Sequence, residues 1–444
     1  MTRPLRCLFV MEDHPLTQDA DGGGPVLMYS HLELFAHSGA SVTLLLVRRD
    51  RRSLGFERYT QTDGKTWERV RGWIESHHVF RMPIAAPRRS APLTHLLLGM
   101  RDPAAYVYPD VTTAVLAEFE RLVAEADPDL IWAENLIPSL LAVRAKTQLP
   151  VVFSHHDHIS KLGRLAKINR GSGWRPRFHS WTAERLERAV IRAASACVSG
   201  SAVEAEELRH LNGGPVVYLP TTYPAPLDAP PGEIPETPRV IHLGGMKTIA
   251  NRGGLARFLE IVWPRLKQDT GAFPEFWVVG DLEGAPESFR ARLASSGAVM
   301  TGFVRNLSEV LRPGDIHIVP WEYATGTRTR IPVILRHGQV LLSTRAAASC
   351  LPELRDGEDC VLVDDLAEMA EQVRLLAGDR ERRARLSRAA RQSFERHFVR
   401  QAVQPRFDAF LEETAPVGSA RRSTRDDGSP GQAVFSRPAR RRRI

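Results

Sequence analysis

The sequence contains few cysteines and no long apolar run. The four cysteines, Cys7, Cys197, Cys350 and Cys360, stand far apart and mostly within apolar stretches. This spacing excludes a disulfide scaffold and a zinc finger. We expect the four thiols to be small buried side chains, in a protein of the reducing cytoplasm. No apolar run reaches the ~18 residues that a membrane-spanning helix needs. Residues 1–10 lack the small-residue cleavage site of a signal peptide, so we interpret them as a first strand.

The chain also has little basic surplus outside its last residues. Its net charge is +8, but residues 421–444 hold eight arginines and two aspartates, a surplus of six charges that leaves +2 for the rest. A nucleic-acid-binding protein carries its surplus on a folded face, often with stacking aromatics, so we expect no nucleic-acid partner. Residues 414–444 have the composition of a disordered basic tail. The abundance of arginine and alanine is typical of a bacterium with GC-rich DNA.

What the chain does contain is an alternation of buried strands and amphipathic helices. Residues 5–10 form an apolar run, residues 26–37 have apolar side chains at helical spacing, and residues 41–47 form a second apolar run. Strand, helix and strand in this order make a βαβ unit, which implies a parallel sheet. The alternation continues to a strand at residues 216–219, so we predict a first Rossmann-like domain over residues 1–219.

A proline-rich segment divides the chain. Residues 220–238 contain seven prolines and almost no periodic apolar pattern, which indicates a linker. A second alternating series predicts another doubly wound domain over residues 239–397, and 444 residues are too many for one ordinary core. The predicted fold is therefore α/β, with two parallel-sheet domains that face a cleft. A last amphipathic helix, over residues 398–413, ends the folded part.

Two glycine-rich turns stand at matching places in the two predicted domains. Gly22–Gly24 open the first helix, and Gly244 and Gly245 follow the first strand of the second domain. Backbone amides in such turns can approach a phosphate without steric hindrance from a side chain. Arg328 and Arg330 precede a predicted helix and could neutralise the phosphate charge. Taken alone, each turn is also explained as a tight connection and each arginine as a solvated residue; two matching turns favour phosphate binding.

The run His155-His156-Asp157-His158 follows a predicted strand at residues 151–154. Histidine and carboxylate are zinc ligands. Adjacent residues at the end of a strand point in diverging directions, so few of them could hold the same ion. We therefore predict no metal site.

Residues 177–192 combine arginines and aromatics at helical spacing. A surface of this kind can rest on a membrane. The interspersed glutamates favour instead a packed helix with a solvated basic face. Peripheral membrane contact therefore stays open as the second interpretation.

Several of these segments, taken in order, resemble those of a known family. Gly22–Gly24 followed by Gly39–Thr43 is similar to the pattern G-G … G-x-x-V-T, and the strand that ends in His156-Asp157 is similar to T-x-H-D. Gly326–Arg330 is similar to the donor-site pattern G-T-R-x-K. The chain thus resembles the retaining glycosyltransferases of the GT-B fold, family four among them, over about residues 5–410.

The resemblance implies a glycosyltransferase that moves a sugar from a nucleoside diphosphate sugar to an acceptor hydroxyl, with retention and without a metal ion. The N-terminal domain would receive the acceptor, which is a saccharide, a lipid-linked molecule or a small molecule. The C-terminal domain would bind the donor, and the final helix would pack back on the N-terminal domain. The donor is a substrate, so no cofactor is expected. The departing phosphate can deprotonate the acceptor, so no dedicated base is needed.

The resemblance also implies roles for single residues. His156 would hydrogen-bond the donor sugar, while Arg328 and Arg330 would stabilise the leaving diphosphate. These three are the expected catalytic residues. Lys247 and Arg252 are alternatives for one basic residue of the donor site. The full set of expected donor-binding residues is Gly23, Gly24, Gly244, Gly245, Lys247, Arg252, Glu322, Gly326 and Thr327.

The sequence departs from the family pattern at one important place. The usual pair of glutamates, spaced E-x7-E, would fall at Thr325 and Val333, and neither is acidic. The second glutamate normally holds the donor ribose by hydrogen bonds, which Val333 cannot make. Two alternatives therefore stay open: a catalytically silent binding or scaffold relative, and a nucleotide-sugar epimerase or hydrolase. A Glu322 carboxylate that reached the ribose would weaken the silent alternative.

Overall fold

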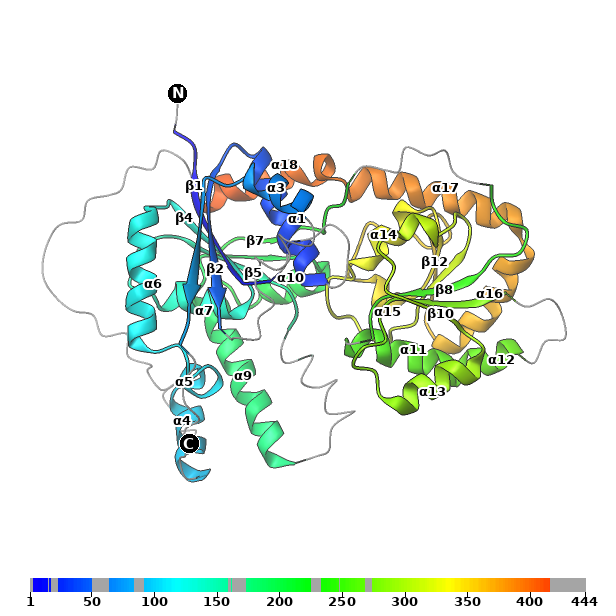
Figure 1. Ribbon diagram of the computed structural model, residues 1–444, viewed down its shortest axis with the longest axis horizontal. Coiled ribbons are helices and arrows are strands. Elements are labelled where there is room, and N and C mark those ends of the chain that lie inside the picture. The colour runs from blue at the N-terminus through cyan, green and yellow to red at the C-terminus, as the bar shows by residue number, and fades with distance from the viewer. Residues whose placement is uncertain are drawn as a thin grey trace, which may run out of the picture.

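The strands form two separate parallel sheets, one in each half of the chain (Figure 1). The computed structural model describes residues 3–14, 16, 23–49, 64–83, 92–158, 161, 173–224, 233–246, 248–267 and 274–415. Residues 225–232 of the predicted linker, the predicted tail from residue 416 on, and Lys247 lie outside the described residues.

The described part of the N-terminal half forms a seven-stranded sheet in the order β3-β2-β1-β4-β5-β6-β7, in which all neighbours are parallel. The order reverses between β1 and β4, which is the Rossmann arrangement. The strands are β1 (Arg6–Glu12), β2 (Ser41–Arg48), β3 (Ser76–Arg81), β4 (Leu130–Glu134), β5 (Val151–His155), β6 (Ala196–Ser199) and β7 (Val216–Tyr218). The helices are α1 (Gly23–His37), α3 (Gly64–Arg71), α4 (Pro92–Arg101), α5 (Pro103–Val107), α6 (Thr113–Ala126), α7 (Leu136–Arg144), α9 (Trp174–Ala193) and α10 (Ala202–Arg209).

The C-terminal half repeats this plan with a six-stranded parallel sheet in the order β10-β9-β8-β11-β12-β13, reversed between β8 and β11. The strands are β8 (Val240–Leu243), β9 (Phe276–Val279), β10 (Val299–Gly302), β11 (Ile316–Val319), β12 (Val340–Thr344) and β13 (Cys360–Val363). The helices are α11 (Ile249–Ile261), α12 (Trp263–Lys267), α13 (Glu287–Ser296), α14 (Arg330–Arg336), α15 (Arg345–Ala348), α16 (Met369–Gly378), α17 (Arg380–His397) and α18 (Arg400–Thr414), with 3₁₀ turns at Leu307–Glu309 and Leu366–Glu368.

Helices cover both faces of each sheet, so the central strands are buried on both sides. Strands in this position consist of continuous rather than alternating apolar residues. In β4 and β5 every residue is buried, and β1 is buried throughout its middle. The sequence patterns of these runs therefore identified the strands, and the predicted fold class of two Rossmann-like domains is confirmed.

The last helix, α18, lies on the N-terminal domain beside α1 (Figure 1). Its Phe407 is buried in the N-terminal core, with its ring centroid 4.9 Å from Phe35 and 5.7 Å from Trp132. The amide of Gln404 donates to the carbonyl of Leu34. The chain therefore passes from the first domain to the second and back again.

The two passages between the domains contact each other. The backbone N–H of Tyr223, before the described C-terminal domain begins, donates to the carbonyl of Phe398 at the end of α17 (2.9 Å). On the other side of the predicted linker, the buried guanidinium of Arg383 donates to the carbonyls of Pro235 and Glu236. Both described ends of the linker are thus fixed by hydrogen bonds to α17 or its end.

All four cysteines are buried and form no disulfide, as expected. Burial raises the pKa of the Cys197 thiol to about 12, so it stays protonated and unreactive at neutral pH.

None of the helices among the described residues combines the length and the apolarity that crossing a bilayer requires.

Phe407→Ala should test how strongly α18 is bound to the N-terminal domain. Loss of a fully buried ring leaves a cavity beside Phe35 and Trp132, so we expect the free energy of unfolding of this domain to fall by about 3–5 kcal/mol. Denaturant unfolding followed by tryptophan fluorescence measures the change. Gln401→Ala, at an exposed position of the same helix, is the control and should have almost no effect. An equally small effect of Phe407→Ala would contradict the packing.

Candidate functional site

One loop of the C-terminal domain contacts the N-terminal domain at the carboxyl ends of the strands. This segment, residues 320–329, connects β11 to α14 and is called the β11–α14 loop below. The N–H of Gly326 donates to Oε1 of the buried Glu204 on α10 (3.0 Å), and the hydroxyl of Tyr223 donates to the carbonyl of Thr329. Ligands of doubly wound sheets bind at these strand ends, near the reversal of strand order. The loop therefore lies where a ligand shared by both domains would bind.

His156 stands between β5 and the start of α1. Its Nε2 lies 2.7 Å from Oε2 of Glu134, the last residue of β4. A Cβ at position 24 would lie 3.5 Å from Nδ1 of His156, so the ring stands at van der Waals distance from the place of a side chain at Gly24. The predicted residues Gly23, Gly24 and His156 thus come together at the carboxyl end of the N-terminal sheet.

Glu134 is a fully buried carboxylate that orients His156. It also accepts hydrogen bonds from Nδ1 of His31 (2.7 Å) and from Nε1 of Trp132 (2.6 Å). Burial alone would raise the pKa of Glu134, but the charges and hydrogen bonds of His31 and His156 outweigh it and hold the pKa well below its usual range. Sequence reasoning missed Glu134 and His31. Their only local signal is a charged residue at the end of an apolar strand and a histidine within the first helix.

Arg330, the first residue of α14, lies against the glycine turn after β8. Its Nη1 donates to the carbonyl of Leu243 (2.6 Å) and lies 3.4 Å from Nε2 of His242. Gly244 has a φ of +130°, and a Cβ there would be 3.3 Å from the Arg330 guanidinium carbon, so the close approach requires glycine. Burial, and then the charge of Arg328, lower the pKa of Arg330 to about 9. The guanidinium is therefore a partly desolvated cation beside the Gly244 turn.

Arg328 is held in the β11–α14 loop with a φ of 47°, an uncommon value for a residue with a side chain. Its guanidinium lies over the ring of Trp321, 5.5 Å from the centroid, and Nη2 donates to Oγ1 of Thr325 (3.2 Å). Burial lowers the pKa of Arg328, although the charges of Asp157 and Glu204 act in the opposite direction. The structure thus brings the two predicted arginines together as adjacent, partly buried cations.

Two further expected donor-binding residues, Gly245 and Arg252, lie at the turn after β8. The side-chain amide of Asn251 donates to the carbonyl of Gly245 (2.8 Å), and Nη1 of Arg252 donates to the carbonyl of Met246 (2.9 Å). These bonds fix the conformation of the turn from the first residues of α11. Arg252 therefore positions the turn, and Lys247 lies outside the described residues.

Gly326 and Thr327 face the N-terminal domain. Gly326 has a φ of +73°, and a Cβ there would come within 2.7 Å of a carboxylate oxygen of Asp157. The side chain of Thr327 lies against Gly200, where a Cβ would come within 2.7 Å of it. Both residues are therefore part of the contact between the domains.

Among the described residues, the Glu322 carboxylate pairs with an arginine other than Arg328 and Arg330. Its carboxylate forms an ion pair with Arg257 of α11 (3.1 Å), and both side chains are partly exposed. Val333 is buried in an apolar cluster on α14, and Thr325 accepts hydrogen bonds from Trp321 and Arg328. The two positions of the expected glutamate pair are therefore occupied by a hydroxyl, that of Thr325, and by a packed apolar side chain, that of Val333.

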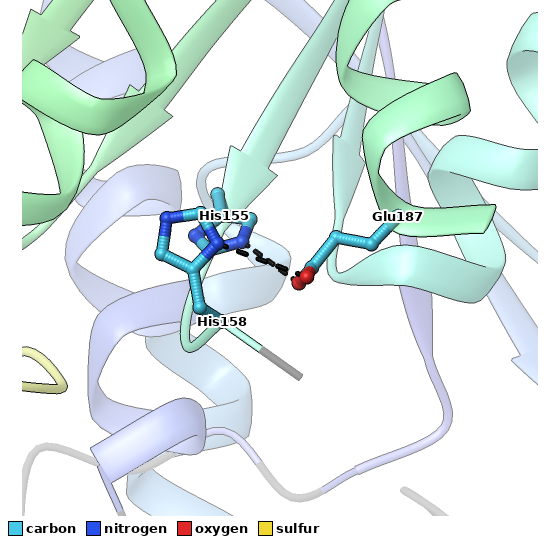
Figure 2. Close-up of side chains that lie close together, drawn as sticks. All are labelled: His155, His158 and Glu187. Atoms are coloured by element: carbon cyan, nitrogen blue, oxygen red, sulfur yellow. Dashed lines mark hydrogen bonds and ion pairs between the residues drawn. The ribbon is translucent and has the colours of Figure 1, made fainter. Parts of the chain in front are cut away.

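The histidine run after β5 does not diverge as the strand pattern predicted (Figure 2). His156 turns towards Glu134, but His158 returns to the side of His155, and their ring centroids are 4.3 Å apart. Both rings point towards the carboxylate of Glu187 on α9. The prediction was wrong for this pair because the chain leaves the strand after His155, so the alternation of a strand no longer applies three residues later.

Glu134→Gln should remove a pH-dependent part of the stability. The folded-state pKa of Glu134 lies below its usual value of about 4.3, so its contribution is complete above that pH and is lost as the pH falls towards the folded-state pKa. We expect the variant to be about 3 kcal/mol less stable at pH 7, because two buried histidines lose a charged partner. The gap should narrow between about pH 5 and pH 3.5.

Denaturant unfolding at a series of pH values measures this gap. Glu118→Gln, an exposed glutamate on α6 that pairs with Arg121, is the control and should change the free energy of unfolding little at any pH. A gap that stays constant with pH would contradict the low pKa of Glu134.

Two family models match the chain in succession. Residues 22–222 match a glycosyl transferase 4-like domain, and residues 237–379 match glycosyl transferases group 1. Together the two matches span more than three quarters of the chain. No curated protein is similar enough in sequence to count as a match.

Solved structures share the fold over nearly the whole chain. Sucrose-phosphate synthase from Thermosynechococcus elongatus is 14% identical, with a TM-score of 0.63 over 92% of this chain and 98% of its own. A glycosyltransferase from Rickettsia africae ESF-5 is 10% identical, with a TM-score of 0.56 over 92% and 98%. Anabaena HepE, in complex with UDP and glucose, is 13% identical, with a TM-score of 0.61 over 92% and 99%. At these identities the structures establish the GT-B fold, and the two family models establish that the chain belongs to the group 1 glycosyltransferases with a glycosyl transferase 4-like N-terminal domain.

Proposed function

We propose that this glycosyltransferase moves a sugar from a nucleoside diphosphate sugar to an acceptor hydroxyl, with retention of configuration and without a metal ion at the point of transfer. The observation that carries the proposal is the pair of partly buried guanidinium groups of Arg328 and Arg330 beside the Gly244 turn. Within the described residues, neither group forms an ion pair with a carboxylate. A bound anion is the partner that they lack.

A diphosphate has the charge and the shape for this position. Burial destabilises both guanidinium cations relative to water, and a nearby anion removes that cost. The negative charge on the leaving diphosphate grows as the glycosidic bond breaks, so fixed cations stabilise the transition state more than the bound donor. The backbone amide of Gly245 is a further donor at the same turn, whereas the N–H of Gly244 is already bonded to the carbonyl of Val279. Neutralisation of the leaving group therefore needs no ion in addition to these residues.

His156 is proposed to contact the donor sugar from the N-terminal domain. Glu134 accepts from Nε2, which leaves Nδ1 directed at the backbone of Gly24 and the start of α1. Glu134 itself is unsuited to act as a base, because its pKa lies well below its usual range. The departing phosphate oxygen would instead take the proton of the acceptor hydroxyl, on the face where the sugar is transferred. This route accounts for retention without a dedicated base.

Uridine diphosphate is the nucleotide to test first, because the structure of Anabaena HepE holds UDP and glucose.

Val333 favours a second candidate function, in which the chain binds a nucleotide but transfers no sugar, since no carboxylate stands at that position to hold a ribose. The proposed transfer consumes the donor only when an acceptor is present. A hydrolase or epimerase turns over the donor alone, and a silent relative leaves it unchanged.

A lipid-linked acceptor is proposed from the surface formed by α4 and the first turns of α9. These helices project from the N-terminal domain away from its sheet (Figure 1). Trp174 and Trp181 are 58% and 45% exposed, and Leu97 and Met100 of α4 are also exposed. The later turns of α9 pack into the core, so the packed-helix interpretation describes that part. Exposed tryptophans with arginines beside them suit the interface of an anionic membrane.

Arg330→Gln should weaken UDP binding about 10- to 100-fold, because a hydrogen bond to a charged group contributes roughly 1.5–3 kcal/mol. A ligand at a hundred times its Kd stabilises the folded protein by about 2.7 kcal/mol, which a thermal-shift assay without metal detects. Arg292→Gln, an exposed arginine on α13, is the matched control and should bind UDP as the wild type does. If no nucleoside diphosphate shifts the melting temperature of the folded wild type, the result contradicts the proposed donor site.

The double variant Trp174→Ala with Trp181→Ala should lose binding to vesicles that contain anionic lipid. Each exposed ring loses apolar area that would enter the interface, so we expect a drop of at least tenfold in the bound fraction at limiting lipid. Vesicle sedimentation measures it, and UDP binding should stay unchanged. Tyr323→Ala, another exposed aromatic residue but on the C-terminal domain, is the control. Equal binding of all three proteins would rule out this surface.

A further inference from the structure

We propose that His155, His158 and Glu187 bind one divalent transition-metal ion of the zinc class, at a site separate from the donor site. Each residue offers one ligand atom, and these atoms all lie within 4.8 Å of one another. Figure 2 shows both imidazole rings directed at the same carboxylate. The ion would be bound inside the N-terminal domain, between the end of β5 and α9.

The ligand atoms are already close to the geometry that an ion requires. Nε2 of His155 lies 3.1 Å from Oε1 of Glu187, and Nδ1 of His158 lies 3.7 Å from Oε2 of Glu187. Zinc bonds to imidazole and carboxylate are about 2.0–2.2 Å long, which places neighbouring ligands of a tetrahedral ion about 3.3 Å apart. All three side chains are at least nine-tenths buried, so their positions are set by packing. Only small side-chain movements would therefore complete the site.

A second layer of carboxylates orients the two histidines. Nδ1 of His155 faces Oε2 of Glu204 at 3.7 Å, and Nε2 of His158 faces Oε2 of Glu207 at 3.1 Å. In each ring, one nitrogen thus points at Glu187 and the other at a different glutamate. Metal-binding histidines show this arrangement, because the outer carboxylate accepts the remaining N–H and fixes the tautomer. A histidine that only pairs with one carboxylate does not need a second one behind it.

Three atoms of this layer lack hydrogen bonds although they are buried. Nδ1 of His155, Nε2 of His158 and Oε2 of Glu204 have no hydrogen-bond partner in the described part of the chain, and all three residues are almost completely buried. Three glutamates, at positions 187, 204 and 207, surround the two rings, while the ammonium of Lys161 pairs with the outermost of them. A bound dication would add positive charge beside these carboxylates and draw the His155 N–H towards Glu204.

The donor atoms select the kind of ion. Two imidazole nitrogens and one carboxylate suit zinc and its neighbours among the transition metals, whereas magnesium and calcium prefer oxygen ligands alone. Three protein ligands leave a fourth position that a water molecule can fill. Outside this cluster, Oε1 of Glu204 accepts the N–H of Gly326 in the β11–α14 loop. The ion would therefore stiffen a carboxylate that joins the two domains.

Metal titration of the untagged full chain tests the site. After treatment with a chelator, the protein should bind one Zn²⁺ per chain by calorimetry, and Co²⁺ should give the visible absorption of a tetrahedral ion. His158→Gln should weaken the affinity at least 100-fold, and Glu207→Gln, which removes only an outer carboxylate, about 10- to 100-fold. His210→Gln is the control, because this exposed histidine lies on the same domain but outside the cluster, and its affinity should not change.

Either of two results would overturn the proposal: no stoichiometric binding to folded wild-type protein, or binding of equal strength in His158→Gln. Glu207 is partly exposed, so its variant should fold even if His158→Gln does not, and unchanged affinity in Glu207→Gln would remove the proposed outer layer. The UDP-induced shift in melting temperature is measured on the same chelator-treated samples. A chain that binds UDP but no ion contradicts only the metal site, and a chain that binds the ion but no nucleotide contradicts only the donor site.

Discussion

The buried carboxylate of Glu204 joins the two domains, and the arrangement of the site depends on it. Ser201 and Glu204 have the spacing of a capping box, in which the glutamate usually turns back to the N–H of the N-cap residue. Here the N–H of Ser201 donates to Oγ of Ser199 (3.2 Å), so Glu204 can accept the N–H of Gly326 from the other domain instead. One oxygen of this helix-capping glutamate therefore contacts a residue 122 positions further along the chain. The other oxygen of the same carboxylate faces His155.

The loop that Glu204 fixes, with the first residue of α14, carries the two arginines of the proposed donor site. Arg328 has a positive φ, which costs roughly 1–2 kcal/mol for a residue with a side chain, and both Arg328 and Arg330 are partly removed from water. Trp321 and the carbonyl of Leu243 hold the two guanidinium groups but do not neutralise them. Strain and desolvation of this kind persist only where the surrounding structure over-determines them, and they concentrate at functional sites. The anion that we propose at this position would relieve both costs.

The sequence predicted the fold better than the site, for a physical reason. Buried parallel strands are continuous apolar runs and turns need glycine, so the runs at β1 and β5 and the Gly244 turn were visible locally. Arg328 and Arg330 were found by resemblance to a family pattern, and the structure brings them together. The pairing of Glu134 with His31 and His156 joins β4, α1 and the segment after β5, and no local pattern encodes it. Val333 was recognised as a departure from the pattern, and its burial on α14 explains how an apolar residue is accommodated there.

The histidine run after β5 shows how one strand end can serve two sites. His155 is the last residue of the strand and points towards α9 and α10, whereas His156 points towards Glu134 and α1. His158 rejoins His155 because the chain turns after the strand. The proposed ion would therefore be bound on the side away from the glycine turn of α1, and its charge would stay apart from the sugar. It would nevertheless fix the backbone that positions His156, so an ion at this place is compatible with a transfer in which Arg328 and Arg330 neutralise the leaving group.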